Sequence, residues 1–133
     1  MPLIVTSNIF LLFPIFVSFF KEEWVFFGIA IGMFVSSVGF HYGYEFYKRS
    51  SMTQSFRMLD WLLAMLGTLY VFYFIINSPE DINLKIFLSS LFMMTIVFFW
   101  YSYVLQNFKG YRRLHPWFHM FAQITLGLIV LFL

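Results

Sequence analysis

The chain has 133 residues, of which 62% are hydrophobic and 11% are charged, and its formal net charge is +2 at pH 7. This composition is far too apolar for a soluble domain of this length, and so small a net charge gives no case for nucleic-acid binding. The absence of cysteine excludes disulfides and thiolate metal sites. We therefore expect a polytopic membrane protein in which any bound metal uses histidine and carboxylate ligands.

Apolar segments follow one another along the whole chain, and each approaches the roughly 20 helical residues needed to cross a hydrocarbon core of about 30 Å. The joints between them are short, charged or proline-bearing and leave no room for a soluble domain. The sequence predicts an all-α fold, a single transmembrane domain over residues 1–133 with about five spans. The predicted spans are 3–20, 24–46, 58–77, 84–106 and 114–133.

Basic residues gather in two of the joints, 47–57 and 107–113. With five spans these two loops share a face, and the positive-inside rule places that face and the N-terminus in the cytoplasm. The first segment carries no basic residue at its start, and no small-residue cleavage site follows it. We therefore expect it to be a mature helix and not a signal peptide.

The few polar residues inside the spans form a pattern. On the second span Ser37 and His41 are four residues apart and so share one helical face. Asp60 lies near the start of the third span, and His115 and His119 repeat the four-residue spacing on the fifth. Because the second span runs toward the cytoplasm while the third and fifth run away from it, we expect the histidines and the aspartate to lie at similar depth, near the cytoplasmic face.

This set of residues suits zinc. Catalytic Zn²⁺ is commonly held by three protein ligands with one position open to water, which makes His41, His115 and His119 candidate ligands. The ion lowers the pKa of its bound water to about 7. Asp60 would accept a proton from that water or orient it, and the Ser37 hydroxyl would assist by hydrogen bonding.

Two further patterns concern helix geometry. Pro116 directly follows the first histidine of the last pair, and proline is typical of the first turn of a helix, so we expect the last helix to begin there. Small residues on the second span, Gly32, Ser36, Gly39 and Gly43, predict close packing against a neighbouring helix.

Each residue taken alone has a simpler interpretation. A single histidine such as His41 at a span end is as well explained by an interfacial hydrogen bond, and Ser37 alone by helix packing. Asp60 alone is compatible with an ion pair to Arg57 one turn earlier. However, an aspartate at a span centre costs about 2.5 to 3.5 kcal/mol, and less near the end, which favours a functional role. Haem ligation by histidines on two helices is a further interpretation, which the four-residue spacing and the nearby aspartate disfavour.

The combination is more specific than its parts. The stretches SVGFH (Ser37 to His41), RMLDWL (with Asp60) and HPWFH (His115 to His119) together resemble the CREST superfamily. This group includes alkaline ceramidases, the progestin and adipoQ receptors and the relatives of the fusion protein myomaker. The resemblance implies a zinc ion bound by the three histidines, with the aspartate and the serine at the catalytic water, and a hydrolase acting on lipid amides or esters.

The chain also departs from that family, whose core usually has seven helices. Here one span, in place of three, separates the aspartate helix from the last helix, which preserves the direction of the last helix. A cavity normally enclosed by the missing helices would then be open to lipid or completed by a second copy, so self-association into a homo-oligomer stays open. The long polar loop between His41 and Asp60 is closest to the myomaker-related branch.

The sequence thus predicts an integral-membrane, zinc-dependent hydrolase that takes a membrane lipid as substrate and resembles a ceramidase. The alternative is a non-enzymatic membrane-remodelling or scaffold protein with a structural metal site. A small haem or quinone protein is the third interpretation.

Overall fold

The computed structural model describes the backbone of residues 7–46, 50–104 and 108–133, and the side chains of these residues except within 102–112. Throughout this part of the chain the regular structure is helical and contains no strand, so the predicted all-α fold is confirmed. The elements in chain order are a 3₁₀ helix η1 (Ser7–Leu11), followed by α2 (Leu12–Phe20), α3 (Trp24–Phe46), α4 (Ser51–Asn77), α5 (Ile82–Val104) and α6 (Phe108–Phe132).

Four of these helices are long and apolar enough to cross a membrane, namely α3, α4, α5 and α6. The apolar helix Ser7–Phe20 corresponds to the predicted first span, 3–20, but is shorter than the other four helices. Residues 3–6 of that span lie outside the described part. Large apolar side chains cover the outside of the bundle, while many of the buried residues are small or polar. Lipid-exposed helices pack in this way, through small residues and interhelical hydrogen bonds. The protein is an integral-membrane helix bundle.

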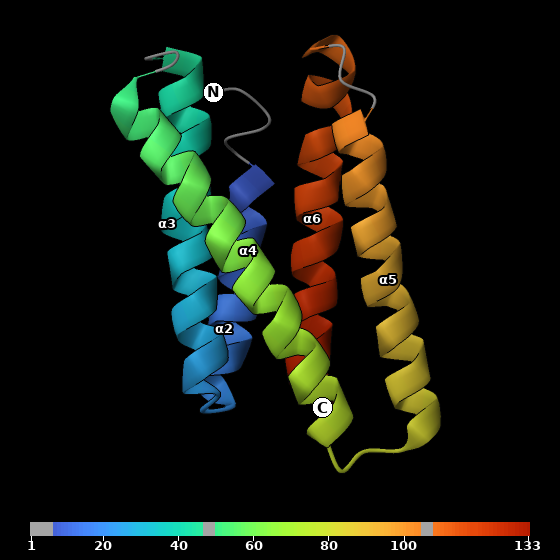
Figure 1. Ribbon diagram of the computed structural model, residues 1–133. Coiled ribbons are helices and arrows are strands. Elements are labelled where there is room, and N and C mark those ends of the chain that lie inside the picture. The colour runs from blue at the N-terminus through green and yellow to red at the C-terminus, as the bar shows by residue number, and fades with distance from the viewer. Residues whose placement is uncertain (1–6, 47–49, 105–107) are drawn as a thin grey trace.

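Figure 1 shows the helices running up and down, with α6 between α2 and α5 and with α4 crossing the front of the bundle. The end of α3, the start of α4, the end of α5 and the start of α6 all lie at one end of the molecule. The helix ends on either side of the two predicted basic joints therefore lie at the same end of the molecule. The side chains of Lys48, Arg49, Lys109 and Arg112 lie outside the described part, and the cytoplasmic orientation stays a prediction.

Helix α4 begins at Ser51, not at residue 58, so most of the predicted loop 47–57 is helical. Ser50 forms the N-cap, with its hydroxyl accepting a hydrogen bond from the backbone N–H of Thr53 at 3.1 Å. Hydropathy marks only the part of a helix that lies in hydrocarbon. A capped helix with no proline or glycine in its first turns extends beyond that part into polar sequence.

Helix α6 begins at Phe108, not at residue 114, so the predicted loop 107–113 is also largely helical. Pro116 consequently lies inside the helix, and the prediction that the last helix starts there was wrong. The proline has no N–H to donate to the carbonyl four residues earlier, but the helix continues on both sides of it. By contrast, α3 has the predicted bounds and α5 begins two residues before its predicted start at 84.

Close packing of α3 against α4 depends on glycine. A Cβ atom placed on Gly39 would lie 2.8 Å from the ring of Phe56, and one on Gly43 would lie 2.7 Å from the Thr53 hydroxyl. Both distances are shorter than side chains tolerate, and Gly32 meets α4 in the same way. The prediction that these glycines allow close approach is confirmed.

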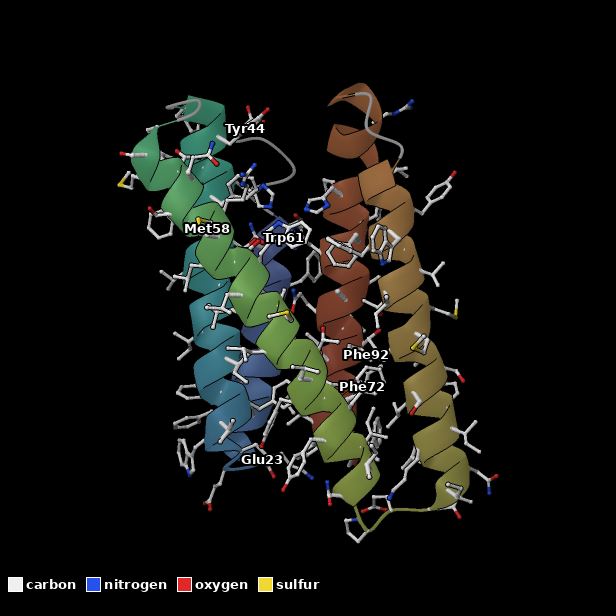
Figure 2. All side chains as sticks on the ribbon, in the orientation of Figure 1. Glu23, Tyr44, Met58, Trp61, Phe72 and Phe92 are labelled. Carbon is white, nitrogen blue, oxygen red and sulfur yellow. The ribbon has the colours of Figure 1, made fainter. Side chains whose placement is uncertain are left out.

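The apolar core lies at the end of the bundle where α3 begins and where α4 and α6 end. Its buried members come from four helices: Phe26, Val71, Ile75, Leu88, Phe92, Ile129 and Val130. Figure 2 labels Phe72 of α4 beside Phe92 of α5, and their rings meet edge to face with centroids 5.5 Å apart. This core fixes one end of the bundle.

Candidate metal centre

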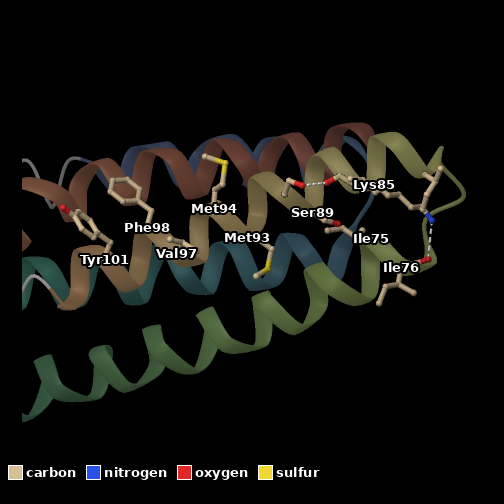
Figure 3. Close-up of a pocket in the computed structure, with 12 residues that line it drawn as sticks. Ile75, Ile76, Lys85, Ser89, Met93, Met94, Val97, Phe98 and Tyr101 are labelled. Carbon is tan, nitrogen blue, oxygen red and sulfur yellow. Dashed lines mark hydrogen bonds between the residues drawn. The ribbon is translucent and has the colours of Figure 1, made fainter.

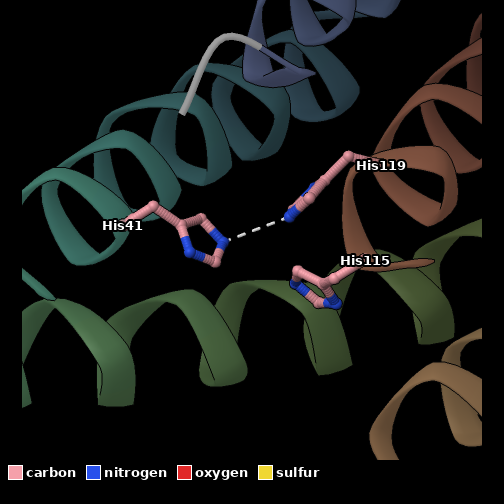
Figure 4. Close-up of side chains that lie close together, drawn as sticks. All are labelled: His41, His115 and His119. Atoms are coloured by element: carbon pink, nitrogen blue, oxygen red, sulfur yellow. Dashed lines mark hydrogen bonds between the residues drawn. The ribbon is translucent and has the colours of Figure 1, made fainter. Parts of the chain in front are cut away.

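The three histidines of the chain lie together at the end of the bundle opposite the apolar core. His41 is in the last two turns of α3, and His115 and His119 are one turn apart on α6 (Figure 4). All three are buried, with 3 to 6% of each residue exposed. The structure therefore brings together all the histidines that the spacing and the topology predicted to meet.

The nitrogen atoms converge on one small space. One ring nitrogen of each histidine lies within 4.8 Å of those of the other two. The Nε2 atoms of His41 and His119 are 3.2 Å apart. In a tetrahedral zinc site with Zn–N bonds of about 2.0 to 2.1 Å, two ligand nitrogens lie roughly 3.3 Å apart. The His41–His119 pair thus has nearly the spacing of two zinc ligands, and His115 offers a third nitrogen within 4.8 Å of both.

The ring orientations disfavour haem. The ring centroids of the three pairs are 4.6 to 5.4 Å apart, and the ring planes meet at 62 to 90°. Each imidazole is in contact with the other two. This packing leaves no slot for a porphyrin plane between an axial pair.

Asp60 of α4 is not part of the three-histidine group but lines the same cavity as His115 and His119. The hydroxyl of Ser36, on the facing side of α3, donates a hydrogen bond to Asp60 Oδ1 at 3.4 Å. The aspartate therefore faces the same cavity as two of the three histidines, and a hydrogen bond from a neighbouring helix orients it. The sequence interpretation treated Ser36 only as a packing residue.

Ser37 also lines the cavity, but its hydrogen bond goes elsewhere. Its hydroxyl donates to Oδ1 of Asn8 at 3.0 Å. Asn8 belongs to η1 and is completely buried. The sequence interpretation missed Asn8, although an amide within an apolar segment is a recognisable signal of a buried polar contact. The assisting role predicted for Ser37 stays a prediction.

Beside the histidines lies a cavity of about 510 Å³. Its polar lining includes Ser37, Asp60, His115, His119 and Gln123. The rest is mostly apolar and comes from η1 and from α2 to α6: Leu11, Pro14, Phe26, Ile29, Ala30, Met33, Trp61, Leu62, Ala64, Met65, Gly67, Thr68, Phe92, Thr95, Ile96, Phe99, Phe118, Ala122 and Leu126. Five helices are thus sufficient to surround a cavity of the size that small ligands occupy, about 300 to 1,000 Å³.

The side of the cavity along α4 faces outward. Trp61, Leu62 and Met65 line it and are also 48 to 57% exposed. Trp61 points from α4 toward α6 in Figure 2, and its ring meets Phe99 of α5 edge to face at 5.9 Å. Phe99 in turn contacts Phe118 of α6 at 5.1 Å. Aromatic rings therefore connect α4 to α5 and α6 beside the histidines.

A second hollow, of about 950 Å³, follows the outer face of α5 toward the end of α4 (Figure 3). Its lining is almost entirely apolar. The Lys85 ammonium at one end donates hydrogen bonds to the carbonyls of Ile76 and Ser78, at the end of α4. The Ser90 hydroxyl donates to its own helix, at the carbonyl of Ile86. These polar groups are engaged with the backbone, so the hollow has the character of a lipid-facing surface.

Comparison with known proteins gives no relative for this chain: no family model, no curated protein and no solved structure matches it.

Proposed function

We propose that the protein is an integral-membrane, metal-dependent hydrolase of lipid amide or ester bonds, with zinc held by His41, His115 and His119. The observation that carries the proposal is the convergence of three buried histidines beside an apolar cavity that an aspartate also lines. The resemblance of the three histidine- and aspartate-bearing motifs to the CREST superfamily supports the same function.

The donor set fits zinc better than other common ions. Neutral imidazole suits Zn²⁺, whereas Mg²⁺ and Ca²⁺ prefer oxygen ligands in larger numbers. Three histidine ligands leave a fourth position for water or a substrate oxygen. A bound Zn²⁺ supplies a Lewis acid that lowers the pKa of water to about 7, so that hydroxide is available at neutral pH.

Asp60 would act as the proton acceptor. Its carboxylate lines the cavity shared by His115 and His119, and the hydrogen bond from Ser36 holds one of its oxygens. In this position it would take a proton from the attacking water and pass it to the leaving amine or alcohol. General base catalysis of this kind contributes about 10²- to 10⁴-fold to a rate.

The cavity walls would hold the acyl chain of the lipid. The lining beyond the polar end is apolar, and the exposed positions Trp61, Leu62 and Met65 mark a side entrance from the membrane. A lipid entering there would place its chain against Phe92 and Leu126 and its polar group beside the histidines. The metal and substrate would meet at the predicted cytoplasmic end of the bundle.

Asp60→Asn tests the catalytic role of the carboxylate. We expect hydrolysis of a panel of fluorescent N-acyl and O-acyl lipids in mixed micelles to fall by about 10²- to 10⁴-fold, with zinc content unchanged, because the amide cannot accept the proton. Ser90→Ala, at an exposed position on the outer face of α5, is the control and should retain full turnover. A variant Asp60→Asn with normal turnover would overturn the role of Asp60.

A structural metal site is the second candidate function, and one observation favours it. In the described part of the chain α3 and α6 have no close backbone contact, so the histidines are a direct link between them. A metal bound there would hold α3 and α6 together in a membrane scaffold. If the parent protein binds zinc but hydrolyses no member of the lipid panel, and if chelation lowers its unfolding temperature, the scaffold function is supported and the hydrolase is contradicted.

A further inference from the structure

Two complementary buried atoms lie one helical turn apart on α6. His119 Nδ1 and Gln123 Oε1 are both inaccessible, and neither has a hydrogen-bond partner among the described residues. His119 is 6% exposed and Gln123 is 2% exposed. A buried polar atom without a partner lowers the stability of the folded state by about 1 to 3 kcal/mol. A hydrogen bond between these two atoms would remove both penalties.

Helix geometry places the Gln123 amide next to the His119 ring. Side chains four residues apart on a helix are neighbours, with Cβ atoms about 5 to 6 Å apart. Long helical side chains also lean toward the N-terminus of their own helix, so the amide of Gln123 covers the turn that carries His119. A hydrogen bond between the two atoms requires a rotation of the glutamine side chain, because neither atom has a partner in the described structure.

The other nitrogen of His119 is already directed to the metal position. Nε2 faces Nε2 of His41 at 3.2 Å, within the three-histidine group. For Nε2 to offer a lone pair to an ion, the proton of the neutral imidazole must be on Nδ1. That proton needs an acceptor, and Gln123 Oε1 is an unpartnered acceptor one turn away.

We propose that Gln123 is the positioning residue of the metal centre: its amide oxygen accepts a hydrogen bond from His119 Nδ1–H and fixes the tautomer that presents Nε2 to the metal. This inference rests on the proposed metal site. Metal-ligating histidines usually donate the second ring N–H to an oxygen acceptor, and loss of such an acceptor typically weakens metal binding 10- to 100-fold. Without metal, the His41 Nε2–H donates to the His119 Nε2 lone pair.

The tautomer of His119 is measured directly by ¹⁵N NMR of metal-free protein labelled at histidine. In the parent we expect the proton on Nδ1. In Gln123→Met, which keeps the shape but offers no comparable acceptor, we expect the proton to distribute over both nitrogens. A parent protein with the proton on Nε2, or a variant with an unchanged tautomer, would overturn the proposal.

Zinc affinity gives the second readout. Gln123→Met should weaken zinc binding roughly 10- to 100-fold. Gln123→Glu retains an acceptor and should stay within a few-fold of the parent, whereas an equal loss in this variant would contradict an acceptor role. Thr125→Val removes another buried hydroxyl from α6, outside the cavity lining, and should leave the affinity unchanged. An equal loss in Thr125→Val would assign the effect to general packing and overturn the inference.

The two proposals fail in different ways. If the parent binds no zinc, the proposed metal site is wrong, and the tautomer comparison in metal-free protein still decides whether Gln123 holds the His119 proton. If zinc binds and Gln123→Met changes neither the tautomer nor the affinity, the metal site stands and the role of Gln123 is wrong.

Discussion

At the scale of single residues, the histidines were predictable and their hydrogen-bonding neighbours were not. The four-residue spacing of His115 and His119 determines that they share a helical face, and the alternation of spans determines that His41 reaches the same depth. Ser36 and Ser37 are adjacent in sequence, and which of them faces Asp60 depends on the rotation of α3 about its axis. That rotation follows from packing against α4 and cannot be read from a polar pattern of one or two residues.

The contact between Asn8 and Ser37, two residues 29 positions apart in sequence, joins η1 to α3. In a double-mutant cycle of Asn8→Ala and Ser37→Ala we expect a coupling energy of about 0.6 to 1.5 kcal/mol, because each hydrogen bond between membrane helices contributes in this range. Unfolding in a detergent titration measures it.

The pair Asn8 and Ser18 provides the control for this cycle. The Ser18 hydroxyl donates to a carbonyl of its own helix, at Pro14, so substitutions at the two positions should add without coupling. A coupling energy near zero between Asn8 and Ser37 would show that their hydrogen bond makes no contribution to the folded state.

At the scale of helices, hydropathy predicted the existence of each element and the bounds of α3, but not where α4 and α6 begin. Both helices extend beyond their apolar segments into polar sequence, where hydropathy carries no signal. For α4 the signal was local, since Ser50 caps a stretch free of proline and glycine. For α6 the proline pattern was misleading, because Pro116 occupies a helix interior in which neighbouring turns continue without its N–H.

The glycines of α3 give a direct test of helix packing. Gly39→Ala should lower the free energy of unfolding by about 1 to 3 kcal/mol, because its Cβ would lie 2.8 Å from the ring of Phe56. Gly28→Ala is the matched control on the same helix, with no atom near its added Cβ. There the substitution should be neutral or stabilise by up to about 1 kcal/mol, as expected from helix propensity. Equal destabilisation by both would contradict close packing at Gly39.

At the scale of the whole molecule, the apolar core and the histidine cluster occupy opposite ends of one bundle. The core joins α3, α4, α5 and α6 where close apolar contact is available, and the histidines join α3 to α6 at the other end. The sequence predicted the bundle and the meeting of the histidines, since both follow from span number and direction. It did not predict the cavity, because a void depends on the shapes of side chains from several helices, as at Trp61, Phe92 and Leu126.

The proposed function depends most directly on whether the three histidines hold a metal. Metal analysis of the detergent-purified protein, after incubation with zinc and removal of the excess, should find roughly one zinc per chain, the stoichiometry of a single three-histidine site. His119→Ala should lose this zinc while its far-UV circular dichroism stays helical, since α6 continues on both sides of the site. A correctly folded parent that retains no zinc, or a His119→Ala variant that retains all of it, would contradict the central claim.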